Sequence, residues 1–345
     1  FKQNVSVNND ISRLDINNTD AAIVVNAARD HAMIVEKIIR LGIPVLVEKP
    51  ISLAFSITNK LVKLAHEKGV LFAAAHVFIF ARYLDNFSSL VFDLGKIKSI
   101  CIDWSDPKSE DRYGELKQFD EGLPIFYDIL PHAFSITAAL TKAKKINNLE
   151  VELYQGGAHV DIKFLLDDIF CHFKFKRNDA ARLRRIDVIA EKKARLDFSN
   201  EPGYINISRQ STCGDKKWDM DKRPVAQMLS SFLVQAAGGA IDKRLDNEIG
   251  KYVNKIIDKV AIHYNKALLS WLKNKLKHPV LVDTDLEYAL KEIILFKGQS
   301  SINIDTCIQN IIHAFNSKDY DKLMNKILKS SKPFEVIRSI AILKT

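Results

Sequence analysis

Short apolar runs alternate with amphipathic segments through the first part of the chain. In order, they predict a strand at residues 21–26, a helix at 31–41, a strand at 44–47, a helix at 54–68 and a strand at 70–75. Each helical segment is followed by a glycine, Gly42 or Gly69, which is typical of a helix C-cap. Strands and helices that alternate with short connections predict an α/β fold with a doubly wound parallel sheet.

A different pattern begins near residue 97, where strands follow one another. Strands are predicted at 97–104, 149–154, 159–165, 169–175, 185–190, 194–198 and 204–207, with a helix near 131–142. Helical periodicity returns at 224–277, 283–295 and 304–328. This order predicts an α+β domain with an open, mainly antiparallel sheet and a helical C-terminal tail. We therefore divide the chain into domains at residues 1–95, 96–240 and 241–345.

The composition is that of a soluble globular protein. Among 345 residues, 47% are apolar and 27% are charged, and the length favours about two domains. No apolar stretch approaches the roughly 18 to 20 residues of a membrane span, so we expect no membrane association. The four cysteines are far apart and fit neither a zinc site nor a secreted disulfide framework. We therefore expect a cytoplasmic protein without a bound metal.

The net charge of the chain indicates which classes of molecule it can bind. The chain has 51 basic and 42 acidic residues, a net charge of +9, which is modest for its length. A solvated lysine-rich surface explains this excess better than a nucleic-acid interface, and a positive field favours anionic small molecules such as nucleotides or nucleotide-linked sugars. The arginine cluster Arg182, Arg184 and Arg185 is predicted to protect a strand edge.

Polar side chains follow each of the three predicted parallel strands. They lie at residues 26–31, at Glu48-Lys49-Pro50 and at residues 76–82. Parallel sheets bind ligands in the crevice at the carboxyl ends of their strands. The sequence therefore predicts a ligand site at these three strand ends.

Two segments resemble the Gfo/Idh/MocA family. Val47-Glu48-Lys49-Pro50 lies between a strand and a helix, after an Asn-x-x-x-x-His segment formed by Asn26 and His31. Asp128-Ile129-Leu130-Pro131-His132 resembles the family's Asp-x-Gly-x-His segment. The family consists of nicotinamide-dependent oxidoreductases, many of which act on sugars and cyclitols. The resemblance covers about residues 5 to 240.

The resemblance implies a dinucleotide-binding Rossmann-like domain at residues 1–95, which would be partial, and a substrate and oligomerisation domain at 96–240. It implies that NAD or NADP exchanges a hydride with a hydroxyl or carbonyl group of a sugar, nucleotide-sugar or cyclitol. The residues expected at the cofactor are Asn26, His31, Glu48, Lys49, Pro50 and His76. The residues expected at the substrate are Arg82, Trp104, Arg112 and Tyr127.

Lys49, Asp128 and His132 are the expected catalytic residues, with Lys49 and His132 acting at the substrate oxygen. Lys49 supplies a donor and a positive charge, and His132 is the best proton shuttle because its ordinary pKa is near 6.5. Asp128 orients the imidazole or binds a substrate hydroxyl, and shares a helix face with His132 if that segment is helical. Because proline fits only the first turn, we expect this helix to begin near Pro131.

Several of these residues also have simpler interpretations. Asp128 is equally well explained as an N-cap residue, and His31 as a residue at a helix start. Arg82 suits either an anionic ligand or a salt bridge between domains.

The chain departs from the family in two places. It contains no Gly-x-Gly-x-x-Gly turn, whose glycines let a backbone approach a pyrophosphate. About 60 residues of a Rossmann half are then expected to be missing, and we interpret the chain as a fragment of a longer protein. Leu130 also stands where the family usually has glycine, which is expected to change how closely the backbone approaches the substrate.

The departures leave alternatives open. One is a non-enzymatic ligand-binding or assembly protein that kept the fold without the cofactor-binding half, and another is a different reaction on the same fold. In the family, the open sheet buries its free face against a second subunit, and an exposed apolar face favours aggregation. We therefore expect a homodimer or homotetramer.

Overall fold

The computed structural model describes residues 18–112, 115–116, 119–219, 223–277, 279–298 and 302–342. Contacts divide the chain into two units. The first unit holds the described residues up to Phe80 together with Asp219–Lys255, and the second holds Ala81–Trp218 and the residues from Ile256 onward. The first unit thus includes a segment that the division at residues 95 and 240 places elsewhere. The functional domains at 1–95, 96–240 and 241–345 stay a prediction.

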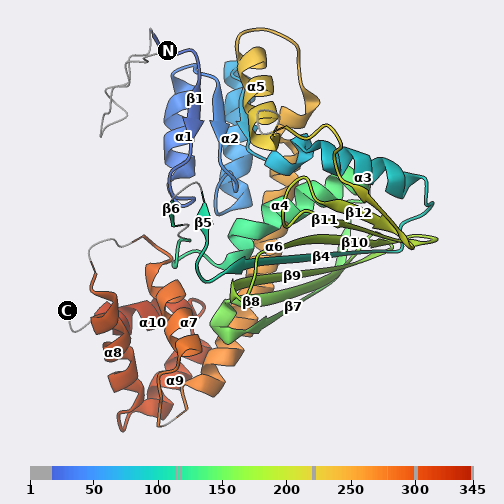
Figure 1. Ribbon diagram of the computed structural model, residues 1–345. Helices are drawn as coiled ribbons and strands as arrows, with labels where there is room; N and C mark the ends of the chain where they lie inside the picture. Colours follow the sequence, from blue (N-terminus) through green and yellow to red (C-terminus); the bar gives the residue numbers. More distant parts are fainter. Residues whose placement is uncertain are drawn as a thin grey trace. The chain divides into compact units, whose positions relative to one another are not determined.

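A three-stranded parallel sheet forms the centre of the first unit (Figure 1). Its strands are β1 (Ala22–Val24), β2 (Val45–Val47) and β3 (Phe72–Ala74), connected by helices α1 (His31–Arg40) and α2 (Phe55–Lys68). The predicted strand and helix order is confirmed. Alternate residues of a strand face the same side, so Val45 and Val47 share one face of the sheet. Both are fully buried there against α1 and α2.

The opposite face of this sheet is covered by a segment far along the chain. Leu46 and Ala73 pack against Met228 and Phe232 of helix α5 (Pro224–Ala236). The sheet therefore has helices on both faces, as a doubly wound sheet requires. The start of α6 (Asn247–Lys275) is also attached here, since the Asn254 Nδ2 donates a hydrogen bond to the Ser52 carbonyl at 2.7 Å.

An eight-stranded sheet organises the second unit, in the order β13-β12-β11-β10-β4-β9-β8-β7. All neighbours are antiparallel except β4 and β9, which confirms the predicted open, mainly antiparallel sheet. Its strands are β4 (Ser99–Pro107), β7 (Ile146–Tyr154), β8 (His159–Leu166), β9 (Ile169–Asp179), β10 (Leu183–Ile189), β11 (Lys193–Asp197), β12 (Tyr204–Ile207) and β13 (Gln210–Cys213). The short hairpin β5 (Asp111–Arg112) and β6 (Glu115–Leu116) follows β4.

One face of this sheet is apolar and is covered by helices α3 (Arg82–Phe92) and α4 (Ile125–Leu140). Phe134 of α4 contacts Phe164 and Phe173, with ring centroids 5.4 and 5.3 Å apart. In Figure 1, α4 lies along the sheet. The apolar residues of the strands are therefore already buried within the unit.

The other face of the sheet is mainly polar and charged, and it also carries the exposed apolar side chains of Phe170 and Ile189. Its side chains form cross-strand ion pairs, including Arg195–Asp187 at 2.8 Å and Lys163–Glu152 at 3.1 Å. Alternation along each strand accounts for the polar side chains on this face, because α4 covers the apolar positions of the opposite face. The homodimer or homotetramer rests on the resemblance alone and stays a prediction.

The arginine cluster does not protect a strand edge, because β10 lies between β11 and β4. Arg184 is 2% exposed, and its guanidinium forms an ion pair with Asp106. It also lies over the indole of Trp104, with Cζ 4.0 Å from the ring centroid. Arg184 is therefore part of the interior, where a paired charge is tolerated.

The C-terminal helices are more numerous and shorter than predicted. After α6 come α7 (Thr284–Leu295), α8 (Ile304–Phe315), α9 (Tyr320–Lys329) and α10 (Pro333–Ile342). The stretch 224–277 is interrupted between α5 and α6, where Gly238 has a φ of 80°. The stretch 304–328 is broken after α8, where the Asn316 side chain bonds both polar backbone groups of Val280. No helix among the described residues combines the length and the apolar character needed to cross a membrane.

Candidate active site

His31 ties together two strand ends of the first unit. The imidazole is 1% exposed, with Nδ1 2.8 Å from the Pro50 carbonyl oxygen and Nε2 2.9 Å from the Asn26 carbonyl oxygen. Asn26 follows β1 and Pro50 follows β2, so one side chain sets the spacing of both connections. His31 was predicted to contact the cofactor, but in the structure its imidazole contacts the backbone carbonyls of Asn26 and Pro50.

Glu48 and Lys49 follow β2 directly. The backbone N–H of Glu48 donates to the Val24 carbonyl at 2.8 Å, which extends the parallel pairing with β1. The Glu48 carboxylate accepts a hydrogen bond from the Lys49 backbone N–H at 3.2 Å. Glu48 thus stabilises the connection, while the half-buried Lys49 carries its ammonium at the carboxyl end of the sheet.

His76 lies at the end of β3 and is buried. It is 3% exposed, and neither ring nitrogen has a hydrogen-bond partner among the described residues. Burial, and then the positive charge of Lys49, lowers the pKa of His76 to about 4. The imidazole is therefore neutral at pH 7 and lies within electrostatic range of Lys49. A Cβ added to Gly250 of α6 would come 3.6 Å from its Nε2.

The contacts of His31 lead to a stability prediction. We expect His31→Ala to lower the free energy of unfolding by about 1–3 kcal/mol, because the variant loses a buried imidazole that lies within hydrogen-bond distance of two backbone carbonyls. Urea denaturation measures the loss. His66→Ala, which removes an exposed histidine of α2, is the matched control. Equal stabilities of the two variants would show that the contacts of His31 contribute nothing.

The second group of predicted residues lies on α4, whose start corrects the prediction. The helix begins at Ile125 rather than near Pro131, with Pro124 as its N-cap. Pro131 lies inside it and lacks the N–H that would bond to the carbonyl of Tyr127. Asp128 and His132 are therefore one turn apart on the same helix face. Asp128 lies within the helix rather than at its N-cap.

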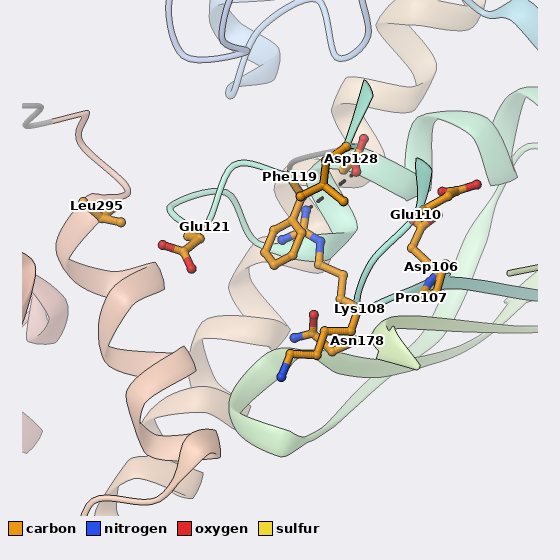
Figure 2. A pocket seen from close by; sticks show the side chains of 11 residues that line it. Asp106, Pro107, Lys108, Glu110, Phe119, Glu121, Asp128, Asn178 and Leu295 are labelled. Atoms are coloured by element: carbon orange, nitrogen blue, oxygen red, sulfur yellow. Dashed lines mark ion pairs between the residues drawn. The ribbon is translucent and has the colours of Figure 1, made fainter. Parts of the chain in front are cut away.

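Asp128 borders a cavity of about 430 Å³ in the second unit. The cavity is lined by Asp106, Pro107, Lys108, Glu110, Leu116, Phe119, Glu121, Asp128, Arg177, Asn178 and Leu295 (Figure 2). Its polar side chains include four carboxylates, one lysine, one arginine and one amide. Such a lining offers both donors and acceptors to a hydroxylated ligand.

Arg177 of β9 is the main residue of this cavity that the sequence reasoning missed. It is 2% exposed, and its Nη2 lies 3.6 Å from the Asp128 carboxylate, the ion pair dashed in Figure 2. Its Nη1 donates to the Leu123 carbonyl at 2.8 Å and to the Tyr288 hydroxyl at 3.2 Å. A signal was present, because Arg177 continues the inward-facing alternation of Phe173 and Phe175.

His132 stacks on Trp104. Their ring centroids are 5.3 Å apart with an interplanar angle of 11°, and Arg184 lies on the indole as well. Trp104 is only 4% exposed, so the imidazole stacks on a buried ring. Leu130, the departure from the family pattern, is fully buried and acts as a core residue of α4.

Of the predicted site residues, Asp128 lines the cavity described above, whereas His132, Trp104, Arg82 and Tyr127 are not among its lining residues. Arg82 forms an ion pair with Asp215 at 2.8 Å, and both belong to the second unit, so this is not a salt bridge between units. Tyr127 borders a different, smaller cavity, and burial raises its pKa. The side chain of Arg112 lies outside the described residues. The described His, Cys, Asp and Glu side chains form no group of three or more that could hold a metal ion.

Comparison with known proteins identifies the class of the N-terminal region. Residues 2–76 match the model of the GFO_IDH_MocA oxidoreductase family, described as an NAD-binding Rossmann fold. This match confirms the predicted resemblance over the segment that carries Asn26, His31, Lys49 and His76. Among curated proteins, none matches the chain.

Solved structures share the fold at low sequence identity. UDP-N-acetylglucosamine 3-dehydrogenase GnnA from Acidithiobacillus ferrooxidans aligns with a TM-score of 0.60 at 18% identity, covering 73% of this chain and 81% of that one. The 3-ketoreductase KijD10 from Actinomadura kijaniata, solved with TDP-benzene and NADP, gives 0.58 at 15% identity, covering 69% and 76%. An inositol dehydrogenase homolog from Azotobacter vinelandii, solved with NADH and myo-inositol, gives 0.57 at 10% identity, covering 72% and 76%.

Proposed function

We propose that the protein is an oxidoreductase that transfers a hydride between NAD(P) and a hydroxyl or carbonyl carbon of a sugar-like substrate. The observation that carries the proposal is the Asp128–His132 pair, one turn apart on α4, in a chain whose residues 2–76 match an NAD-binding Rossmann fold. Three structural neighbours support this substrate class. One is named for a nucleotide sugar, one was solved with TDP-benzene and one with myo-inositol.

The residues at the strand ends fit part of a nicotinamide cofactor. His76 has two buried ring nitrogens without a hydrogen-bond partner among the described residues, next to the charge of Lys49. A bound carboxamide or ribose hydroxyl would satisfy such nitrogens. The 345 residues contain no Gly-x-Gly-x-x-Gly turn, so they supply no pyrophosphate cradle of that kind. The cofactor, when bound, supplies or accepts the hydride.

The side chains of the second unit would handle the substrate and its proton. His132 would take the proton of the reacting hydroxyl, with its ring held by the stack on Trp104. Asp128 would accept a hydrogen bond from a substrate hydroxyl while Arg177 keeps the carboxylate in place. Asn178 and Lys108 of the same cavity would bind further hydroxyl oxygens. The strand-end lysine, Lys49, would bind at the cofactor.

A fluorescence titration with NADH and with NADPH tests the proposal. We expect saturable binding of one cofactor, and about tenfold weaker binding by Lys49→Met because a charge-assisted contact is lost. Lys63→Met, which removes an exposed lysine of α2, is the matched control and keeps wild-type affinity. Absence of binding at millimolar cofactor would overturn the proposal and favour a protein that kept the fold for ligand binding or assembly.

A further inference from the structure

Helix α7 of the C-terminal tail reaches the cavity that Asp128 borders. Leu295, the last residue of α7, is one of the residues that line it. In Figure 2, Leu295 and Glu121 lie on the same side of this cavity. The helix lies beyond residue 240, where the resemblance to the Gfo/Idh/MocA family ends. The tail therefore adds a side chain of its own to the cavity in which the substrate would bind.

Two glycines let α7 approach the rest of the second unit closely. A Cβ added to Gly122, which follows Glu121, would lie 2.6 Å from the Cβ of Leu295. At the other end of the helix, a Cβ added to Gly156 would lie 2.0 Å from the carbonyl oxygen of Asp285. Non-bonded carbon atoms pack at about 3.5–4.0 Å, so a side chain at either position would force α7 away. Both ends of α7 are therefore held against neighbouring turns.

Three side chains on one face of α7 point to the same cavity. Tyr288, Lys291 and Leu295 are three and four positions apart, which places them on one helix face. The Tyr288 hydroxyl accepts a hydrogen bond from Arg177 Nη1 at 3.2 Å. The Lys291 ammonium lies 3.6 Å from the Glu121 carboxylate. Tyr288 and Lys291 do not line the cavity, but each contacts a side chain that does.

Tyr288 helps to fix the guanidinium that pairs with Asp128. Arg177 is 2% exposed, and its Nη1 donates to the Leu123 carbonyl as well as to Tyr288. Because a guanidinium is planar and rigid, holding Nη1 also orients Nη2, which lies 3.6 Å from the Asp128 carboxylate. Tyr288 thus acts on Asp128 through Arg177, as Lys291 acts directly on Glu121.

Given the proposed function, we propose that this face of α7 determines the specificity of the cavity, with Tyr288 and Lys291 as positioning residues. The carboxylates of Asp128 and Glu121 accept hydrogen bonds from two hydroxyl groups of one sugar-like ring. Leu295 packs against the C–H groups of that ring. A ring without these hydroxyl groups offers the two carboxylates no donor and is rejected.

The lining suits a neutral polyhydroxylated six-membered ring. It holds four carboxylates against one lysine and one arginine, so an anionic ring substituent is disfavoured. The volume of about 430 Å³ lies within the range of about 300–1,000 Å³ for small-molecule sites.

Isothermal titration calorimetry with D-glucose, D-galactose and myo-inositol tests the proposal on the unaltered protein. We expect saturable binding of at least one of these rings and none of cyclohexanol, which has a single hydroxyl group. Absence of saturable heat from all three rings at millimolar concentration would overturn the proposal.

Variants of α7 connect the binding to the tail. Tyr288→Phe removes one hydrogen bond and is expected to weaken binding of the ring about fivefold. Tyr154→Phe, which removes an exposed hydroxyl bonded to Glu152, is the matched control and keeps wild-type affinity. Lys291→Met is expected to weaken binding about threefold, and Lys291→Arg to restore it. Undiminished affinity in a folded Tyr288→Phe variant would overturn the proposal.

A double-mutant cycle separates positioning from a general structural effect. Because Tyr288 acts through Arg177 on Asp128, we expect Tyr288→Phe to cause no further loss of affinity in the Asp128→Asn background. Equal losses in the two backgrounds would contradict the positioning role.

The titrations with NADH and NADPH distinguish this proposal from the proposed function. Ring binding that depends on α7, in a protein that binds neither cofactor, would overturn hydride transfer and leave the role of α7 intact. Cofactor binding together with a ring affinity that the α7 variants do not change would overturn the role of α7 alone.

Discussion

Replacing His132 by alanine is expected to lower turnover by about 10²-fold or more, the usual contribution of a general acid or base. The imidazole is the group of α4 whose ordinary pKa lies nearest to neutrality, and its ring is fixed by the stack on Trp104. The alanine variant keeps the helix, because alanine is the best helix former. Turnover is measured with the cofactor that the protein binds, by the change in nicotinamide absorbance.

Two further variants separate proton transfer from a structural effect. His313→Ala removes an exposed histidine of α8 and is expected to keep wild-type turnover. Trp104→Leu removes the stacking partner but leaves the imidazole, so it is expected to lower turnover less than His132→Ala and to shift the pH profile. Unchanged turnover in His132→Ala would exclude this residue as the acid or base.

The sequence pattern predicted the three parallel strands of the first unit and the helices between them, because their residues are buried in a regular way. Val45, Leu46 and Val47 are all at most 1% exposed, which is why a short uninterrupted apolar run identified β2 as a strand with helices on both faces. Gly69 has a φ of 62°, as its predicted role as a C-cap requires. The local sequence and the final fold agree here, so local reasoning was sufficient.

The start of α4 was predicted wrongly because local reasoning gave too much weight to one proline. A proline inside a helix costs about 3 kcal/mol, which favoured a helix that begins at Pro131. The surrounding side chains are almost all buried, including Phe126, Ile129, Leu130 and Phe134, and their packing against the sheet offsets that cost. The amount of burial depends on the tertiary fold and is not visible in the segment itself.

The buried arginines show a second limit of sequence reasoning. Arg177 and Arg184 were treated as surface charges or passed over, since arginine is almost never fully buried unless it is paired. Both are 2% exposed, and their partners Asp128 and Asp106 are distant in sequence. Only a three-dimensional arrangement reveals such pairs, although the alternation along β9 placed Arg177 on the inward face.

Removing Arg177 is expected to give the largest loss of stability. In Arg177→Met the Asp128 carboxylate loses its ion pair, and the Leu123 carbonyl and the Tyr288 hydroxyl lose a donor. We expect the free energy of unfolding to fall by about 3 kcal/mol, because the former partners of the buried guanidinium are left without it. Burial raises the pKa of Glu292 on α7 to about 8, and the charge of Arg177 lowers it. Without that charge, the pKa of Glu292 is expected to rise above this value in the variant.

Urea denaturation of Arg177→Met and Arg185→Met measures this difference within one sheet. Arg185 pairs with Asp197 at 3.2 Å on the charged outer face, where both side chains are about 30% exposed. An exposed ion pair contributes about 0–1 kcal/mol, so Arg185→Met is expected to lose little. Equal losses of unfolding free energy in the two variants would show that the buried Arg177 contributes no more to stability than the exposed Arg185. A large loss confined to Arg177→Met would establish that the wall of the cavity beside Asp128 is also a structural core of the second unit.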